Sequence, residues 1–249
     1  MRRVGMSAIL GVLMLVVPAS AQTSRPPGAG RPVRVVIANG RLSSVTGGPL
    51  HFKLLRVTLG AGQASECAGP DGMLYVLSGG IDGIFDGEKR AVREGSAAFL
   101  PAGRRSTLNA IAGAPAVMLH FLLASASDLS VVPCGRPAAA AELHLTPRPI
   151  EGLKPGPYEF TMTRVSVERG VPRPPMHHRT GAALYYTLAG TWTLHRQEAA
   201  SAPRARGAIQ FEPYDFIHTW ENTGETTGIL LQANISPEGA PEIVFLPTH

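Results

Sequence analysis

Short runs of hydrophobic residues, many of them alternating with polar ones, recur along the chain from about residue 34 to the C-terminus. Runs of this kind with turn residues between them are typical of β-strands. The 28 glycines and 22 prolines among the 249 residues suit many tight turns. Helical periodicity is weak, and the piece best able to form a helix is 137–143. The pattern therefore predicts an all-β chain.

The strand pattern occurs twice. Three pairs of segments carry the repeat, in the same order and 108 to 112 positions apart: F-K-L-L-R-V-T-L from Phe52 with F-T-M-T-R-V-S-V from Phe160, Y-V-L-S-G from Tyr75 with Y-T-L-A-G from Tyr186, and G-S-A-A-F-L-P from Gly95 with G-A-I-Q-F-E-P from Gly207. So steady an offset indicates a duplicated domain. In the first pair the alternation changes parity midway in both copies, which predicts a β-bulge at the same point in each. We expect two small β-barrels in tandem.

The N-terminus has the pattern of a secretory signal peptide. Arg2 and Arg3 precede the short apolar run 8–17, and Ala19-Ser20-Ala21 forms an A-x-A cleavage site before Gln22. The alternative is an N-terminal membrane anchor, but the run is short for a bilayer span. We expect a periplasmic or secreted protein without a stable membrane anchor. Cleavage lowers the formal charge from +5 to +3, and a mildly basic exported protein is not expected to bind nucleic acid.

The expected organisation follows from these signals. It is a signal peptide over 1–21, an arm and first strand over 22–45, a first barrel over 46–130, a linker over 131–157 and a second barrel over 158–249.

The chain has two cysteines, Cys67 and Cys134. An even number in an oxidising compartment favours one disulfide, and two unpaired thiols are the alternative. A disulfide closing this loop of about 67 residues would contribute roughly 4 kcal/mol.

One motif lies in the second copy at a regular spacing. Gly207, Pro213, His218 and Asn222 follow one another in order, with Asp215 between the second and the third. This resembles the second motif of the cupins, G-x5-P-x-G-x2-H-x3-N, in which Asp215 takes the place of the last glycine. Every spacing of that motif fits.

The first cupin motif, G-x5-H-x-H-x(3,4)-E-x6-G, is matched less completely. Its frame is present in Gly170, the pair His177 and His178, and Gly190, whereas its glutamate position holds Ala183. The resemblance covers the chain from about residue 33 and implies a bicupin, an all-β fold of two tandem cupin-type jelly-roll barrels. The first copy keeps only the scaffold residues, with Ser106 at the position of the second-motif histidine, and we expect it to have a structural role.

The resemblance also implies a metal inside the second barrel, held by histidines and a carboxylate. The expected ion is Fe, Mn, Zn or Ni, bound by His218 and His178 with His177 as the fallback. Residues two apart on a strand share a face, so the two motif slots hold either Met176 and His178 or His177 and Arg179. The first register is preferred, because a buried unpaired guanidinium would cost several kcal/mol. The other outcome is no metal, with His218 a buried, hydrogen-bonded side chain.

Two functions of different classes remain open. The first is a metal-dependent enzyme of the dioxygenase, decarboxylase, isomerase or lyase type acting on a small organic molecule, with Glu212 or Tyr186 moving protons. The second is a non-catalytic module that binds a sugar or a small acid in the same cavity. The intact second motif places the enzyme narrowly first. The candidate substrate-binding residues are Arg179, Tyr185, Trp192 and Trp220. The expected partner is a small molecule, and a second copy of the chain is an open alternative.

Overall fold

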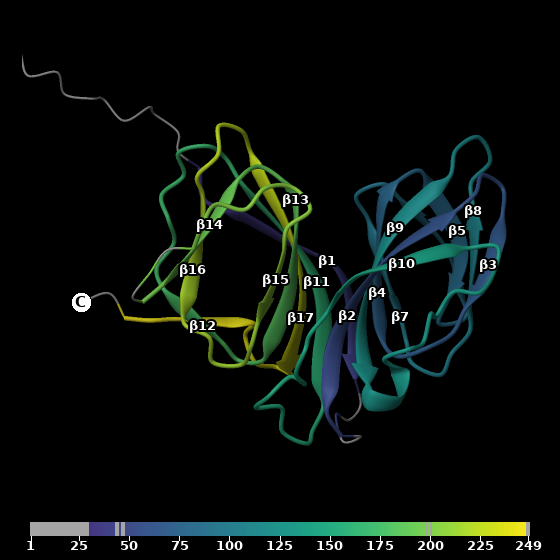
Figure 1. The fold of residues 1–249 in the computed structure, drawn as a ribbon, viewed down its shortest axis with the longest axis horizontal. Helices are drawn as coiled ribbons and strands as arrows, with labels where there is room; N and C mark the ends of the chain where they lie inside the picture. Colours follow the sequence, from purple (N-terminus) through teal and green to yellow (C-terminus); the bar gives the residue numbers. More distant parts are fainter. Residues whose placement is uncertain (1–29, 43–44, 46–47, 198, 200, 248–249) are drawn as a thin grey trace, which may run out of the picture.

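The computed structural model describes residues 30–42, 45, 48–197, 199 and 201–247. Two β-barrels lie side by side, one built mainly from the first half of the chain and the other mainly from the second (Figure 1). The predicted signal peptide and its cleavage site lie outside the described residues. Within the described part, no helix is long and apolar enough to cross a membrane. The predicted all-β class and the predicted pair of barrels are confirmed.

Each barrel consists of a five-stranded and a four-stranded antiparallel sheet. In the N-terminal barrel the five-stranded sheet has the order β10 (Ala139–Leu145), β2 (Leu50–Leu59), β9 (Ala116–Ser125), β4 (Gly72–Ser78) and β7 (Ala97–Leu100). Its four-stranded sheet has the order β3 (Ala64–Cys67), β8 (Ser106–Ala110), β5 (Gly80–Phe85) and β6 (Glu88–Arg93). A single 3-10 turn, η1 (Ala126–Asp128), follows β9 in the described part.

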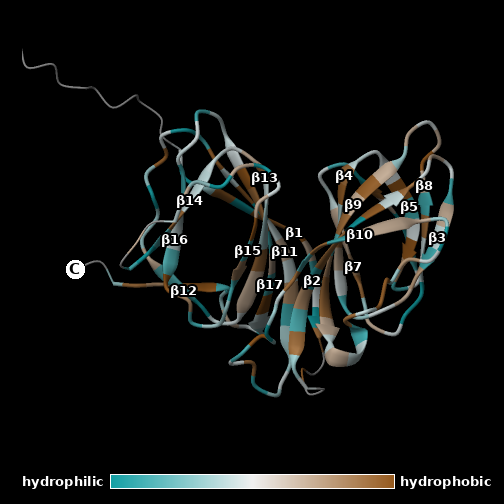
Figure 2. Cartoon of the chain, viewed as in Figure 1, coloured by the Kyte–Doolittle hydropathy of each residue, from teal (hydrophilic) through white to brown (hydrophobic). Residues whose placement is uncertain are grey.

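The C-terminal barrel repeats this arrangement. Its five-stranded sheet has the order β1 (Val33–Leu42), β11 (Tyr158–Val167), β17 (Gly228–Pro237), β13 (Ala182–Ala189) and β15 (Ile209–Glu212). Its four-stranded sheet has the order β14 (Trp192–Arg196), β16 (His218–Asn222), β12 (His177–Arg179) and β18 (Ile243–Phe245). Figure 2 shows hydrophobic residues concentrated in the strands and many hydrophilic ones in the outer loops.

The strands β2 and β11, in the middle of the molecule, each contribute residues to two hydrophobic cores. Phe52 and Leu54 belong to a core between the two barrels, whereas Leu55, Val57 and Leu59 of the same strand belong to the core inside the N-terminal barrel. β11 divides in the same way. The change of parity in the sequence arises from this division. The predicted bulges do not lie in β2 and β11 themselves, since these strands pair with β9 and β17 in unbroken register. A register shift does lie opposite the parity change in each copy, with the extra residue in the outer partner, β10 or β1.

The N-terminal arm and the expected linker each contribute a strand to a barrel. β1, from the N-terminal arm, pairs with β11 and so completes the sheet of the C-terminal barrel. β10, from the expected linker, pairs with β2 of the N-terminal barrel. The helix considered for 137–143 is therefore wrong, because most of this segment forms an edge strand whose hydrogen bonds go to β2. Each barrel thus depends on residues beyond the bounds expected for it from the repeat.

The N-terminal barrel is closed by packing and by one covalent bond. Cys67 and Cys134 form a disulfide that fastens the end of β3 to the chain after β9. Cys67 is thereby unable to ligate a metal, and the neighbouring Glu66 is exposed and paired with Arg105. His120, on β9, is 1% exposed and has no hydrogen-bond partner at either ring nitrogen. Burial lowers the pKa of His120 to about 4, so the ring is neutral at physiological pH.

Candidate functional site

The three residues of β12 decide which side chains enter the C-terminal barrel. Successive strand residues point to opposite faces. His177 and Arg179 are 7% and 1% exposed, whereas His178 is half-buried and its Nδ1 lies 2.9 Å from Oδ1 of Asp215. The inward register is therefore that of His177 and Arg179. The expected register, with His178 and Met176 inward, is wrong.

The loop before β16 shows why the second motif can have Asp215 in place of its glycine. Asp215, which stands where the cupin motif has glycine, has a φ of 58°. Aspartate is one of the few non-glycine residues that reach this left-handed region. Gly103, at the equivalent place in the first copy, has a φ of 71°. The backbone is thus left-handed at this position in both copies, and in the second copy the residue also places a carboxylate next to His178.

Arg179 lies inside the barrel, and each nitrogen of its guanidinium donates a hydrogen bond. Its Nε donates to Oε2 of Glu212 at 2.6 Å, and its Nη1 donates to Oδ1 of Asn234 at 2.8 Å. Its Nη2 donates to the hydroxyl of Tyr185. These acceptors come from β15, β17 and β13, so three different strands supply the partners. The preference for His178 assumed an unpaired guanidinium, and the carboxylate and the two polar partners remove that objection.

Glu212 is the anion of this buried group. It is 0% exposed, its Oε2 accepts from Arg179, and its Oε1 accepts from Nε1 of Trp220 at 2.6 Å. Nε2 of His218 lies 2.8 Å from the same Oε1. Burial by itself raises the pKa of Glu212, but the charges of Arg179 and His218 and the hydrogen bonds outweigh it, so that the pKa falls to about 2. Glu212 is therefore ionised at neutral pH.

Two histidine rings meet beside this group. His177 pairs with His218 across β12 and β16, and their ring centroids are 4.5 Å apart. Nδ1 of His177 lies 3.3 Å from the carbonyl oxygen of Pro175, and Nδ1 of His218 lies 2.9 Å from that of Phe216. Burial, followed by the charges of His218 and Arg179, lowers the pKa of His177 to about 4. His177 is thus a neutral ring at physiological pH.

The side chains in the expected metal position do not fit a metal centre of the predicted kind. Such a centre needs three or four ligands that converge on one point. His177 and His218 supply two imidazoles, but the second slot of the motif holds Arg179, which has no lone pair to offer. The carboxylate of Glu212 is engaged by Arg179 and Trp220. Across the residues that the structure describes, no group of three His, Cys, Asp or Glu side chains could hold a metal ion.

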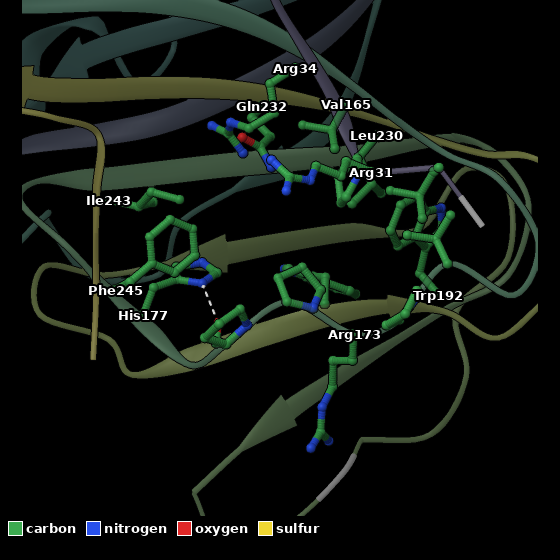
Figure 3. Close-up of a pocket in the computed structure, with 18 of the residues that line it drawn as sticks. Arg31, Arg34, Val165, Arg173, His177, Trp192, Leu230, Gln232, Ile243 and Phe245 are labelled. Atoms are coloured by element: carbon green, nitrogen blue, oxygen red, sulfur yellow. Dashed lines mark hydrogen bonds between the residues drawn. The ribbon is translucent and has the colours of Figure 1, made fainter. Parts of the chain in front are cut away.

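A cavity of about 480 Å³ opens into the same barrel. Of the predicted site residues, His177, Tyr185, Trp192 and Trp220 line it. The chain has two tryptophans in all, and both lie in this wall. Apolar side chains form most of the remaining surface: Val165, Val167, Val171, Leu230, Ile243 and Phe245. Figure 3 shows His177, Ile243 and Phe245 at one side of the cavity and Trp192 at the other.

The other predicted residues lie elsewhere. Arg179, Glu212 and His218 are buried beside the cavity but do not line it, and His178 faces away. Tyr186 packs against the core between the two barrels, on the opposite face of β13 from Tyr185. The structure therefore brings the predicted aromatic residues and one histidine to the cavity. It does not bring the two candidate proton-transfer residues there.

Sequence reasoning missed several residues of the cavity. Arg31 and Arg34 come from the arm and β1, and Phe245 comes from β18, so each reaches the site through long-range strand pairing. No local pattern reveals such pairing. Gln232 did leave a signal, because it is a polar residue inside the apolar run of β17. It is 3% exposed, and its Oε1 has no hydrogen-bond partner.

Comparison with known proteins places the fold among solved structures. No family model matches the chain, and no curated protein matches it. A structure of Bacillus subtilis oxalate decarboxylase, concerned with the Mn(II) centres of that enzyme, is 14% identical with a TM-score of 0.53 and covers 88% of this chain and 80% of that chain. A mutant of the same enzyme is 14% identical with a TM-score of 0.53, over 83% and 79% of the two chains.

A mutant of salicylate 1,2-dioxygenase from Pseudoaminobacter salicylatoxidans also matches. It is 10% identical over 76% of each chain, with a TM-score of 0.48. At these identities the likeness lies in the fold. The decarboxylase match confirms the predicted architecture of two tandem jelly-roll barrels.

Proposed function

We propose, from the bicupin fold that this chain shares with oxalate decarboxylase, that its C-terminal barrel binds a small, largely apolar organic molecule without a resident metal. One observation carries the proposal. A cavity of about 480 Å³ with apolar and aromatic walls stands beside a buried Arg179–Glu212 pair, in which Arg179 occupies a slot where the cupin motif has a histidine. Cavities of roughly 300–1,000 Å³ with such walls and a few polar groups are the usual form of small-molecule sites.

The buried polar group has a positioning role in this account. Glu212 receives a hydrogen bond from Trp220, and Arg179 donates one to Tyr185. Trp220 and Tyr185 both line the cavity, and their rings lie 5.6 Å apart. The ion pair therefore fixes two aromatic side chains of the binding wall. In this function the Arg179–Glu212 pair shapes the cavity, and the ligand touches the aromatic rings.

The proposed location of this activity is outside the cytosol. The signal-peptide pattern of residues 1–21 supports export, and the disulfide between Cys67 and Cys134 is a hint of an oxidising compartment. A small-molecule binding protein in the periplasm or medium would bind compounds that reach the cell from outside.

A metal-dependent enzyme in the same barrel is the second candidate. The contact between the rings of His177 and His218 favours it, since two imidazoles there supply part of a ligand set. The engagement of Glu212 by Arg179 weighs against it. Elemental analysis after incubation with Mn, Fe, Zn and Ni in turn separates the two candidates, because the enzyme requires one bound ion per chain.

Tryptophan fluorescence tests the proposed function directly, because both tryptophans lie in the cavity wall. The mature protein is titrated with cyclohexanecarboxylate and cyclohexanol, which do not absorb where tryptophan does. We expect a saturable change in emission. Val165→Phe, which fills the cavity, should abolish it, whereas Ile84→Phe on the exposed surface of the N-terminal barrel should not. Absence of any saturable response to small apolar molecules would overturn the proposal.

A further inference from the structure

One side of the cavity is formed by β18, a strand of three residues at the edge of the four-stranded sheet. Ile243 and Phe245 line the cavity, and Figure 3 shows both on the same side as His177. Figure 1 shows this strand in yellow beside β12, the strand with which it pairs. Its other edge has no partner strand within the residues that the structure describes.

β18 also buries little of its own surface. Val244 is 38% exposed and Phe245 is 54% exposed, and no residue of the strand belongs to a hydrophobic core cluster of the described chain. Just beyond the strand, the amide of Leu246 donates to the carbonyl oxygen of Met176 at 2.8 Å. Segments with few buried apolar contacts open locally at a small cost in free energy. Apolar packing therefore holds this wall of the cavity only weakly.

A carboxylate directly before the strand supplies a stronger attachment. Oε1 of Glu242 accepts from the hydroxyls of Thr161 at 2.5 Å and Thr163 at 3.1 Å, and Oε2 accepts from Nη2 of Arg34 at 2.7 Å. The threonines belong to β11 and the arginine to β1, so Glu242 ties an edge strand of one sheet to two strands of the other. We call these four residues the Glu242 clamp.

The clamp is connected to the barrel interior and acts on the wall. The hydroxyl of Thr161 accepts from Nδ2 of Asn234 at 3.3 Å, and Oδ1 of Asn234 accepts from Arg179. Hydrogen bonds thus link β18 to the buried ion pair. Glu242, Thr161 and Thr163 are not among the residues that line the cavity. A change in any of these three alters how firmly the wall is held without removing a contact with the ligand.

We propose that β18 is a gate, which separates from β12 and from the opposite sheet to let the ligand enter and leave, and that the Glu242 clamp sets how often it opens. The proposal rests on the proposed function of the barrel and adds the route to its cavity. The same opening precedes entry and exit. Weakening the clamp should therefore raise the rate constants of binding and release by the same factor and leave the dissociation constant unchanged.

Removal of the clamp carboxylate tests this expectation. The probe is cyclohexanol, which is neutral, so a change in protein charge does not alter its attraction. Its release rate constant comes from nuclear magnetic resonance line shapes, and its dissociation constant comes from the tryptophan titration. We expect Glu242→Ala to speed release about tenfold, because charge-assisted hydrogen bonds are lost, and to keep the dissociation constant within about twofold. An unchanged release rate, or a dissociation constant that rises in step with it, would overturn the proposal.

The chain offers a matched control. Glu238 pairs with Arg41 of the same strand β1, at 2.6 Å, but neither residue lines the cavity or contacts β18 through an ion pair. Glu238→Ala should leave both constants unchanged. If Glu242→Ala does not fold, Thr163→Val serves, since it removes one clamp donor at nearly constant shape and should speed release about threefold. A folded Thr163→Val with the release rate of the wild type would contradict the proposal.

A covalent lock gives the opposite perturbation. His178 and Val244 are paired across β12 and β18, and neither lines the cavity. Facing residues of antiparallel strands lie within reach of a disulfide. His178→Cys with Val244→Cys should therefore fasten the gate, and the oxidised form should release cyclohexanol about tenfold more slowly than the reduced form. The wild type with the same reductant controls for the native disulfide. Equal rates from both forms would refute the gate.

Hydrogen–deuterium exchange separates the gate from its premise, because it needs no ligand. The amides of 243–247 should exchange about tenfold faster in Glu242→Ala than in the wild type, and at the wild-type rate in Glu238→Ala. If neither cyclohexanol nor cyclohexanecarboxylate binds but exchange responds in this way, only the proposed function is wrong. If a probe binds and neither exchange nor release responds to Glu242→Ala, only the gate is wrong.

Discussion

Replacement of Arg179 by Met removes the cation of the buried ion pair inside the C-terminal barrel. Arg179 is 1% exposed and donates to Glu212, Asn234 and Tyr185. Methionine retains much of the hydrophobic stem but leaves the carboxylate of Glu212, 0% exposed, without its cation. Breaking a buried ion pair by removal of one partner costs about 3–5 kcal/mol.

The pKa of Glu212 gives the pH dependence of this stabilisation. It is about 2 in the folded protein, against an ordinary value of 4.5. A carboxyl whose folded pKa is depressed contributes stability above its unfolded pKa, and that stability is lost as the pH falls towards the folded value. The difference corresponds to roughly 3 kcal/mol at neutral pH, of which Arg179 is the largest favourable cause.

The assay is urea denaturation followed by tryptophan emission, which reports on the C-terminal barrel because both tryptophans lie there. We expect Arg179→Met to lower the free energy of unfolding by about 3–5 kcal/mol at pH 7, and by less near pH 4, where Glu212 can take up a proton. The double variant Arg179→Met with Glu212→Gln should recover most of the loss, since the unpaired charge is gone. A loss below about 1 kcal/mol, or a double variant no more stable than the single one, would refute the reasoning.

Three further predictions concern the metal site, the pH dependence and the disulfide. Arg179→His restores an imidazole in the second slot and releases Glu212, so the variant should take up about one Zn or Ni ion per chain by elemental analysis, whereas the wild type should not. His120, with a pKa lowered to about 4 from 6.5, is neutral when folded and takes up a proton when unfolded, so stability should fall as the pH drops from 6.5 to 4; His120→Leu should flatten this fall in denaturation midpoints measured across that range. Replacing Cys67 and Cys134 by Ala opens a loop whose ends are 67 residues apart and should lower the unfolding free energy by about 4 kcal/mol, whereas an unchanged midpoint would contradict the stabilising role.

The sequence was sufficient to predict the architecture because the duplication is visible in three pairs of segments that keep the same order and nearly the same offset. Phe52 and Phe160 stand at equivalent places, and both proved to face the core between the barrels. The bulge prediction failed on the same strands, since a regular strand that supplies two cores produces the same change of parity as a bulge. Pattern alone cannot separate these causes, because it does not show what lies on either side of a sheet.

The sequence predicted only part of the candidate site. The cupin spacing located His218 and the strand of His177, but the choice between the two inward registers depended on Arg179. That side chain is stable inside the barrel because Glu212, Asn234 and Tyr185 meet it from three other strands. The contacts with Glu212 and Asn234 are long-range and do not follow from local spacing. For the same reason the arginines of the arm could not be assigned to the cavity before the pairing of β1 with β11 was known.

The most direct test of the central claim compares ligand binding by metal-free and metal-loaded protein. Mature protein treated with a chelator, and the same protein incubated with Mn, Fe, Zn or Ni, are titrated calorimetrically with whichever of cyclohexanecarboxylate and cyclohexanol gives the stronger change in tryptophan emission. We expect one site per chain and the same dissociation constant in every sample, because Arg179 occupies a histidine slot of the motif and engages the carboxylate of Glu212. Binding that appears only after a metal is added, with one ion retained per chain, would contradict the account.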